Sequence, residues 1–188
     1  MTTVDQHSAL VLIDLQQGIL DLPVMTPAEE ILARAARLAD AFRSHDLPVV
    51  RVRVAWSADG GDLPPAHTEV PGPLKPPPAA FSQFPPTFPS APGDILIVKR
   101  HWGAFTGTEL DLQLRRRGVT HIVLAGISTS FGVESTARAA WEHGYDLTVV
   151  SDATTDTDAG SHANSFTKIF PRLGEIATTD QIVAAIKS

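Results

Sequence analysis

Short apolar runs alternate with segments of helical periodicity along most of the chain. The apolar runs are rich in Val, Ile and Leu and have the length of buried strands; they cover residues 9–15, 47–54, 94–100, 121–126 and 146–151. Helical patterns cover residues 27–45, 108–117, 132–143, 159–170 and 179–187. Such alternation is typical of right-handed βαβ crossovers. The pattern predicts an α/β fold, a three-layer α/β/α sandwich around a mostly parallel, Rossmann-like sheet of about six strands.

A Pro-rich segment, residues 57–93, interrupts this alternation. It holds most of the chain's 15 prolines and therefore can form little regular structure. A loop of this length is uncommon in a compact domain and is usually functional or disordered. We expect a covering loop rather than a linker, because the βα pattern before it is too short to fold alone. Residues 1–188 are therefore predicted to form a single domain.

Composition excludes several classes of protein. The formal net charge is −6, which disfavours binding to the phosphate backbone of a nucleic acid. No apolar run approaches the roughly 18 residues of a membrane span, and the first apolar stretch lacks a basic leader. We therefore expect a cytoplasmic protein without a membrane or nucleic-acid partner. The chain has no cysteine, which excludes disulfides, thiolate metal sites and a thiol nucleophile.

Polar residues at the ends of the predicted strands mark the candidate site, because ligands of open parallel sheets bind outside the carboxyl ends of the strands. Asp14 closes the first strand, Lys99 closes the third, and the turn at 126–132 leaves the fourth and enters a helix. A carboxylate after an apolar run needs a compensating cation, and Lys99 can supply it. A structural ion pair explains these two residues as well. Small hydroxyl residues in the turn are ordinary N-caps, but a helix N-terminus also suits an oxyanion.

These residues resemble the isochorismatase-like, or cysteine hydrolase, family. The resemblance rests on Asp14, on Lys99 with the following RHWGAF and TGTELD, and on GISTSFGVESTAR at 126–138. It extends over nearly the whole chain and includes the later SDATTD and KIFPRLGEI. The family's catalytic group is an Asp, a Lys and a Cys. The resemblance implies that Asp14 is the acid/base and Lys99 its electrostatic partner, and that Gly132 stands where most members carry the Cys.

The resemblance also implies how the substrate is held. Backbone N–H groups of Ser128 and Gly132 would form an oxyanion hole beside a cis peptide bond between Ile127 and Ser128. The residues expected to bind the oxyanion or the substrate are Ile127, Ser128, Thr129, Phe131, Trp102 and Phe105. For the aromatic residues of the expected apolar wall, core packing is an equally good interpretation; they are Trp56, Phe81, Phe84, Trp102 and Phe105. We expect no metal and no other cofactor.

The missing thiol limits the possible reactions. Family amidases proceed through an acyl-enzyme on the Cys, and that route is closed here. Isochorismatases of the family also carry a glycine at this position; they protonate the enol carbon of a vinyl ether, and water captures the resulting cation. We therefore predict a hydrolase for a small acidic or vinyl-ether-like metabolite, with Asp14 as general acid/base. Two alternatives stay open, a non-catalytic ligand-binding pseudo-enzyme and an amidase that uses Ser130 or activated water.

Two further points stay open at this stage. Lys99 should lower the pKa of Asp14, whereas burial under the Pro-rich loop should raise it, and the sequence does not decide which effect is larger. The segment AWSADGGD follows the second predicted strand, where isochorismatases carry a polar segment with a glutamine, so the substrate is not fixed. Family members often associate through helical faces, so we expect a homo-oligomer, a dimer or larger.

Overall fold

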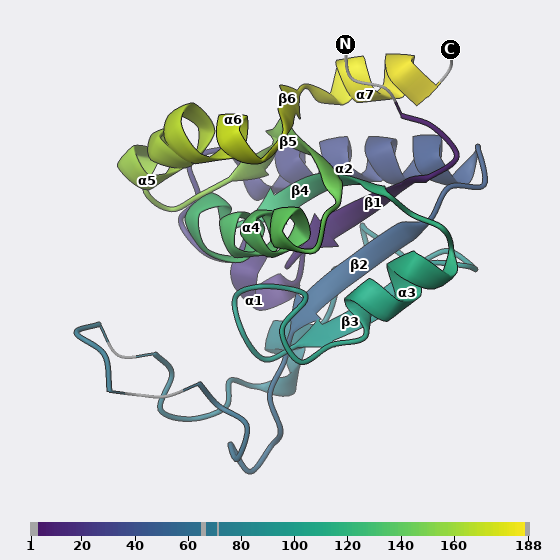
Figure 1. The fold of residues 1–188 in the computed structure, drawn as a ribbon. Coiled ribbons are helices and arrows are strands. Elements are labelled where there is room, and N and C mark those ends of the chain that lie inside the picture. The colour runs from purple at the N-terminus through teal and green to yellow at the C-terminus, as the bar shows by residue number, and fades with distance from the viewer. Residues whose placement is uncertain (1–3, 65–66, 71, 187–188) are drawn as a thin grey trace.

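Six parallel strands form one central sheet in the order β3-β2-β1-β4-β5-β6 (Figure 1). The strands are β1 (Ser8–Ile13), β2 (Val49–Val54), β3 (Ile95–Lys99), β4 (His121–Ile127), β5 (Asp146–Thr155) and β6 (Glu175–Ala177). This computed structural model describes residues 4–64, 67–70 and 72–186. Residues 65, 66 and 71 of the predicted loop and residue 187 of the last predicted helix lie outside the described residues. The predicted α/β sandwich is confirmed, and every strand pairing in the sheet is parallel.

Helices cover both faces of the sheet (Figure 1). One face packs against α2 (Ala28–Arg43) and α7 (Thr179–Ile186). The other packs against α3 (Leu110–Arg116), α4 (Glu134–Glu142) and α6 (Phe170–Leu173), with α5 (Ala159–Asn164) before α6. Within the residues that the structure describes, no helix has both the length and the apolar character needed to cross a bilayer.

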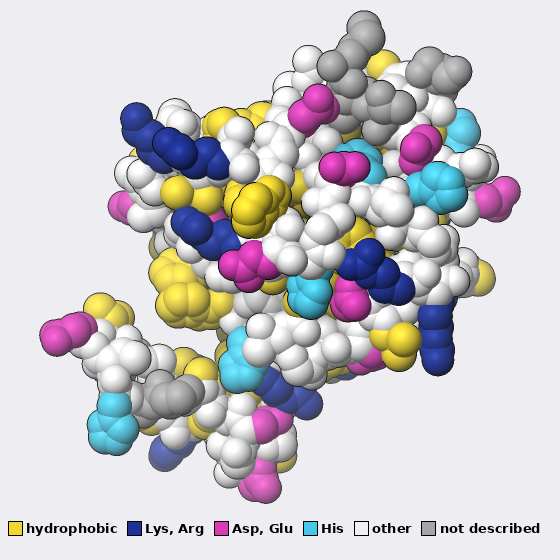
Figure 2. All heavy atoms as spheres, viewed as in Figure 1, with side chains coloured by type: hydrophobic (Ala, Val, Ile, Leu, Met, Phe, Trp, Pro, Cys, Tyr) yellow, Lys and Arg dark blue, Asp and Glu magenta, His cyan; other side chains and the backbone are white. Residues whose placement is uncertain are grey.

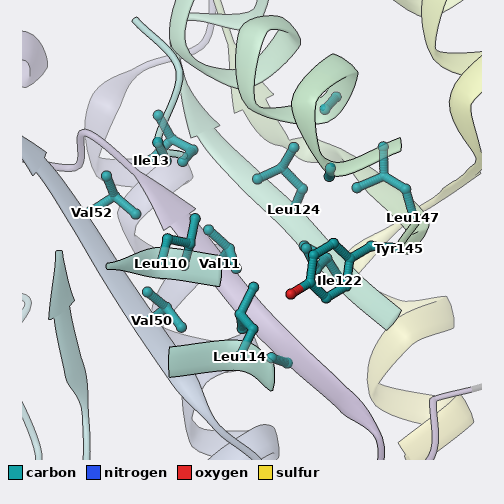
Figure 3. Close-up of a cluster of buried hydrophobic side chains, with 14 of the residues drawn as sticks. Val11, Ile13, Val50, Val52, Leu110, Leu114, Ile122, Leu124, Tyr145 and Leu147 are labelled. Carbon is teal, nitrogen blue, oxygen red and sulfur yellow. The ribbon is translucent and has the colours of Figure 1, made fainter. Parts of the chain in front are cut away.

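The alternation of side chains along β1 explains why both faces are covered. Val11 and Ile13 point into one core cluster, whereas Leu10 and Leu12 point into the other. Figure 3 shows the first cluster, in which residues of β1, β2 and β4 meet Leu110 and Leu114 of α3. A strand that is apolar on both faces can be buried only between two layers.

Several elements differ in their limits from the predicted ones. Two short elements were not predicted, α1 (Gln17–Leu20) and the 3-10 helix η1 (Ala79–Ser82), because single turns show no periodicity. The predicted helix 132–143 begins earlier, with the π-helical turn η2 (Thr129–Val133) before α4. The predicted helix 159–170 consists of α5, the π-helical turn η3 (Ser165–Ile169) and α6.

The neighbouring strands β1 and β4 form the point at which the strand order reverses. Ile13 of β1 pairs with Gly126 of β4 at their carboxyl ends. Gly126 has a φ of +131°, and a Cβ at this position would lie 2.2 Å from the carbonyl oxygen of Ile13. The close approach therefore requires a glycine. Ligands of open α/β sheets bind in the crevice at such a reversal, which places the expected site beyond these two strand ends.

Candidate active site

Asp14 and Lys99 form a buried ion pair beyond the carboxyl ends of the strands. Asp14 directly follows β1 with a φ of +52°, a left-handed conformation that Asp tolerates better than most residues. Lys99 is the last residue of β3, and its Nζ lies 2.7 Å from Asp14 Oδ2. Only 1% of the Lys99 side chain and 8% of the Asp14 side chain are exposed. The ammonium group also donates to the carbonyl oxygen of Trp102, so two of its three donors are engaged.

The second carboxylate oxygen of Asp14 is buried and has no hydrogen-bond partner among the described residues. Burial raises the pKa of Asp14 to about 6, although the charge and hydrogen bond of Lys99 lower it. Of the two opposing effects on this carboxyl, burial is therefore the larger. A group with a pKa near 6 exchanges its proton readily close to neutral pH, as a general acid or base must.

Gly132, in the η2 turn, lies against this ion pair. A Cβ at position 132 would lie 3.1 Å from Asp14 Oδ2 and 3.1 Å from Lys99 Nζ. It would also lie 2.9 Å from Cγ2 of Ile13, so that methyl group would have to shift slightly. A side chain at this position would therefore touch both charged groups. The peptide bond between Ile127 and Ser128, which begins the turn, is cis, as predicted.

Two hydroxyl groups of the turn, those of Thr129 and Ser130, bond to side chains that follow β5. The backbone N and the Oγ of Ser130 donate to Asp156 Oδ2, at 2.7 and 2.8 Å. Thr129 is fully buried, and its Oγ1 lies 2.8 Å from Nδ1 of His162. Neither Thr129 nor Ser130 lines the cavity beside Asp14. The hydroxyl group of Thr129 is thus engaged with His162, and its expected role in substrate binding stays a prediction.

A cavity of about 1030 Å³ opens beside Asp14 and Lys99. Ile127, Ser128 and Phe131 line it, as expected of substrate-binding residues. Most of its wall is apolar, with Ile19, Leu22, Val54, Trp56, Pro64, Val70, Pro73, Phe81 and Trp102 among the lining residues. Figure 2 shows the Pro-rich loop standing out at lower left, with hydrophobic side chains (yellow) on the adjacent part of the body. The loop therefore supplies part of the cavity wall.

Two aromatic residues expected in the cavity wall lie elsewhere. Phe105 is 8% exposed and belongs to the core, and its ring stacks on that of the exposed His143, with the two centroids 5.0 Å apart. Phe84 packs on the guanidinium group of Arg51 at 4.0 Å. Neither residue lines the cavity, and the position of Phe105 agrees with core packing, the alternative interpretation of its aromatic side chain. Within the described part of the chain, no three His, Asp or Glu side chains group closely enough to hold a metal ion.

Gln16 is a residue of the site that sequence reasoning missed. It is fully buried, and its Nε2 donates to the carbonyl oxygens of Val54, at 2.9 Å, and Phe81, at 3.1 Å. Its Oε1 accepts from the backbone N of Val54 at 2.7 Å. One side chain thus joins the end of β2 to the Pro-rich loop and holds Phe81 at the cavity wall. The only sequence signal was an amide directly after a buried strand.

Comparison with known proteins agrees with this geometry. Residues 8–181 match the isochorismatase domain. The chain is 46% identical to the uncharacterized isochorismatase family protein YecD of Escherichia coli O157:H7, over 95% of this chain and 96% of that protein. It is 29% identical to the ureidoacrylate amidohydrolase RutB of Enterobacter sp. (strain 638), over 82% of this chain and 77% of that protein. An isochorismatase family protein from Burkholderia thailandensis has a similar structure, with a TM-score of 0.95, 44% identity and coverage of 99% of this chain and 98% of that one. The chain therefore belongs to the isochorismatase family of hydrolases.

Proposed function

We propose that this chain hydrolyses a small vinyl-ether-like or acidic metabolite by general acid/base catalysis at Asp14, with water as the nucleophile. The observation that carries the proposal is the surroundings of Gly132. A side chain there would touch both Asp14 and Lys99, so this is the place for a nucleophile, and the chain has only a hydrogen atom there. This arrangement fits the branch of the family that lacks the catalytic cysteine, and we place the chain in that branch.

The cavity beside Asp14 and Lys99 can admit a water molecule or a substrate oxygen. Asp14 Oδ1 has no partner among the described residues, and one N–H donor of Lys99 is left over after Asp14 and Trp102. An oxygen atom in that space can donate a hydrogen bond to the carboxylate and accept one from the ammonium. Lys99 then positions the oxygen while Asp14 moves the proton.

For a vinyl ether, Asp14 alone can donate the proton that the reaction needs and take one back afterwards. Protonated Asp14 delivers its proton to the enol carbon, which leaves an oxocarbenium ion. Water adds to the cationic carbon and returns a proton to the carboxylate, and the hemiketal then breaks its C–O bond to give an alcohol and a ketone. The pKa near 6 permits this cycle, since the protonated form is populated near neutral pH.

Amide hydrolysis by activated water is the second candidate, favoured by the similarity to the ureidoacrylate amidohydrolase RutB. In that reaction ionised Asp14 accepts a proton from the attacking water, and it later gives that proton to the departing nitrogen. Ser130 is a poor candidate for the nucleophile, because its hydroxyl group donates to Asp156 and does not line the cavity. A non-catalytic role is also disfavoured, because the site keeps a buried carboxylate with an unpartnered oxygen.

Replacement of Asp14 by Asn tests the proposal. The purified protein is incubated with isochorismate, with a neutral aryl vinyl ether and with a panel of small amides, and the carbonyl product and ammonia are measured. We expect Asp14→Asn to abolish whichever activity the wild type shows, because the amide side chain cannot exchange a proton. Asp180→Asn is the matched control, since Asp180 is 77% exposed in a surface ion pair with Arg37. Turnover retained by Asp14→Asn would refute the assignment.

The pH profile of the same assay separates the two reactions. A general acid must be protonated, so a vinyl-ether hydrolase loses activity as the pH rises above the pKa of Asp14, about 6. A general base must be ionised, so an amidase gains activity up to the same pH and then levels off. A profile without an inflection near that value would contradict both roles of Asp14.

A further inference from the structure

The lysine and the arginine that line the cavity are already paired with carboxylates, and His101 is the other basic side chain in its wall. Lys99 pairs with Asp14 at 2.7 Å, and Arg100 Nε donates to Asp62 Oδ2. Asp62 is itself fixed, because its Oδ1 accepts from the backbone N and the Oγ of Ser57, at 2.7 and 2.8 Å. Among the described lining residues, neither Lys nor Arg is left without a carboxylate partner.

The cavity also presents aromatic surface that the protein itself leaves uncovered. Trp102 is 65% exposed and Phe131 is 45% exposed, and their rings meet edge to face with centroids 5.0 Å apart. Trp56 and Phe81 form a second pair at 6.2 Å. All four side chains line the same cavity, and they come from four separate segments of the chain. Exposed aromatic side chains that converge on one cavity indicate a ligand with an apolar body.

We infer that the substrate presents an uncharged aromatic or apolar group to the wall formed by Trp56, Phe81, Trp102 and Phe131. The inference deepens the proposed function, on which it rests for the identity of the site. Of the two substrate characters implied by the resemblance, it favours the neutral, vinyl-ether-like one over the acidic one.

The charges of the cavity explain this preference. A carboxylate that enters loses its hydration, and it needs a cation or several donors in return. Lys99 is neutralised by Asp14, and Arg100 by Asp62, so an entering anion gains little attraction and meets two existing negative charges. Glu69, an exposed residue in the part of the wall that the loop forms, adds a third negative charge. A neutral aromatic ring has no such penalty and buries the exposed faces of Trp102 and Phe131.

The test compares two indole probes of similar size, neutral indole-3-ethanol and anionic indole-3-acetate. Neither contains a bond that the proposed hydrolase would break, so binding is measured without turnover. Isothermal titration calorimetry is performed on the whole protein at a pH well above 6, where Asp14 is ionised. We expect the alcohol to bind at least about tenfold more tightly than the carboxylate.

Variants locate the binding and assign its cause. Trp102→Ala should weaken the binding of the alcohol several-fold, whereas Trp141→Ala should not, since Trp141 is 55% exposed but does not line the cavity. Asp14→Asn should reduce the ratio between the dissociation constants of the carboxylate and the alcohol. The reason is that Lys99 then lacks a counter-charge and attracts the carboxylate. Equal or tighter binding of the carboxylate by the wild type would overturn the inference, as would the absence of saturable binding of either probe. If the wild type shows no preference for the alcohol but Asp14→Asn still loses turnover, the inference fails and the proposed function stands.

Discussion

Gly132 is the residue at which the proposed function places a missing nucleophile, and its surroundings are suited to one. The absent side chain would reach a carboxylate oxygen and an ammonium nitrogen, each 3.1 Å from its Cβ. Asp14 can accept the proton of a thiol at this position, and the ammonium of Lys99 then stabilises the thiolate, so the two groups together favour ionisation of the thiol. The chemistry of position 132 thus depends on Asp14 and Lys99, which are distant from it along the chain.

A cysteine introduced at this position should be reactive. We expect the thiol of Gly132→Cys to react with iodoacetamide faster at neutral pH than an ordinary thiol, with a pKa below about 8.5. The chain has no other cysteine, so alkylation followed by mass spectrometry has no background. Ser44→Cys, at an exposed position after α2, is the control. The displaced methyl group of Ile13 should lower the stability by about 1–2 kcal/mol. Equal alkylation rates for the two variants would show that Lys99 does not act on position 132.

Among the elements, the contact between β1 and β4 fixes the crevice in which the site lies. Gly126 lets the two backbones approach until only a hydrogen atom fits between them, and this contact places Asp14 beside the turn that follows β4. The obstacle to a larger residue is backbone of the central strand, which cannot move aside as a side chain can.

The free energies of unfolding of two Gly→Ala variants test how closely β1 and β4 approach. Gly126→Ala would place its Cβ 2.2 Å from the carbonyl oxygen of Ile13, and we expect a loss of more than about 4 kcal/mol in the free energy of unfolding. Gly144→Ala is the control, because Gly144 also has a positive φ, +78°, but has no atom within 4 Å of the added Cβ. Its backbone strain alone should cost about 1–2 kcal/mol. Urea denaturation measures both, and similar losses would mean that β1 and β4 do not approach as described.

In the molecule as a whole, the rigid sheet and the Pro-rich loop meet at a few polar contacts. The loop supplies part of the cavity wall but projects from the body (Figure 1). Gln16 fastens it through Phe81, and the ion pair of Arg100 with Asp62 fastens it nearer its start. The second half of the loop is held further by the bonds of Ser82 Oγ to the carbonyl oxygen of Val54 and of Arg51 to that of Phe88. Since the bonds of Gln16 hold the loop and not the strands to each other, their loss should affect the loop more than the sheet.

The variant Gln16→Leu tests this division. It removes three hydrogen bonds to Val54 and Phe81, so we expect chymotrypsin to cleave within residues 57–93 faster than in the wild type. Gln17→Leu is the control, since Gln17 is exposed and its side chain bonds only to Asp21, at 3.3 Å. Cleavage products identified by mass spectrometry give the sites. Cuts spread through the sheet, or equal rates for the two variants, would contradict the proposed anchoring.

The sequence by itself determined the layers of this protein and the edge at which its candidate site lies. Both conclusions depend on local patterns: apolar periodicity selects strand or helix, and a polar residue after a buried strand marks the carboxyl end of a parallel sheet. For this reason Asp14 and Lys99 were found without any structure, and together with the run around Gly132 they carried the family resemblance.

Only the tertiary structure decided how the remaining side chains are used. Thr129 bonds to His162 and Phe105 stacks on His143, partners that are distant along the chain and have no pattern linking them. Gln16 connects two segments that become neighbours only when the loop folds back. The protonation of Asp14 was open for the same reason, since it depends on how completely water is excluded, and burial proved larger than the attraction of Lys99. Periodicity is a property of neighbours in sequence, whereas desolvation and hydrogen bonding are properties of neighbours in space.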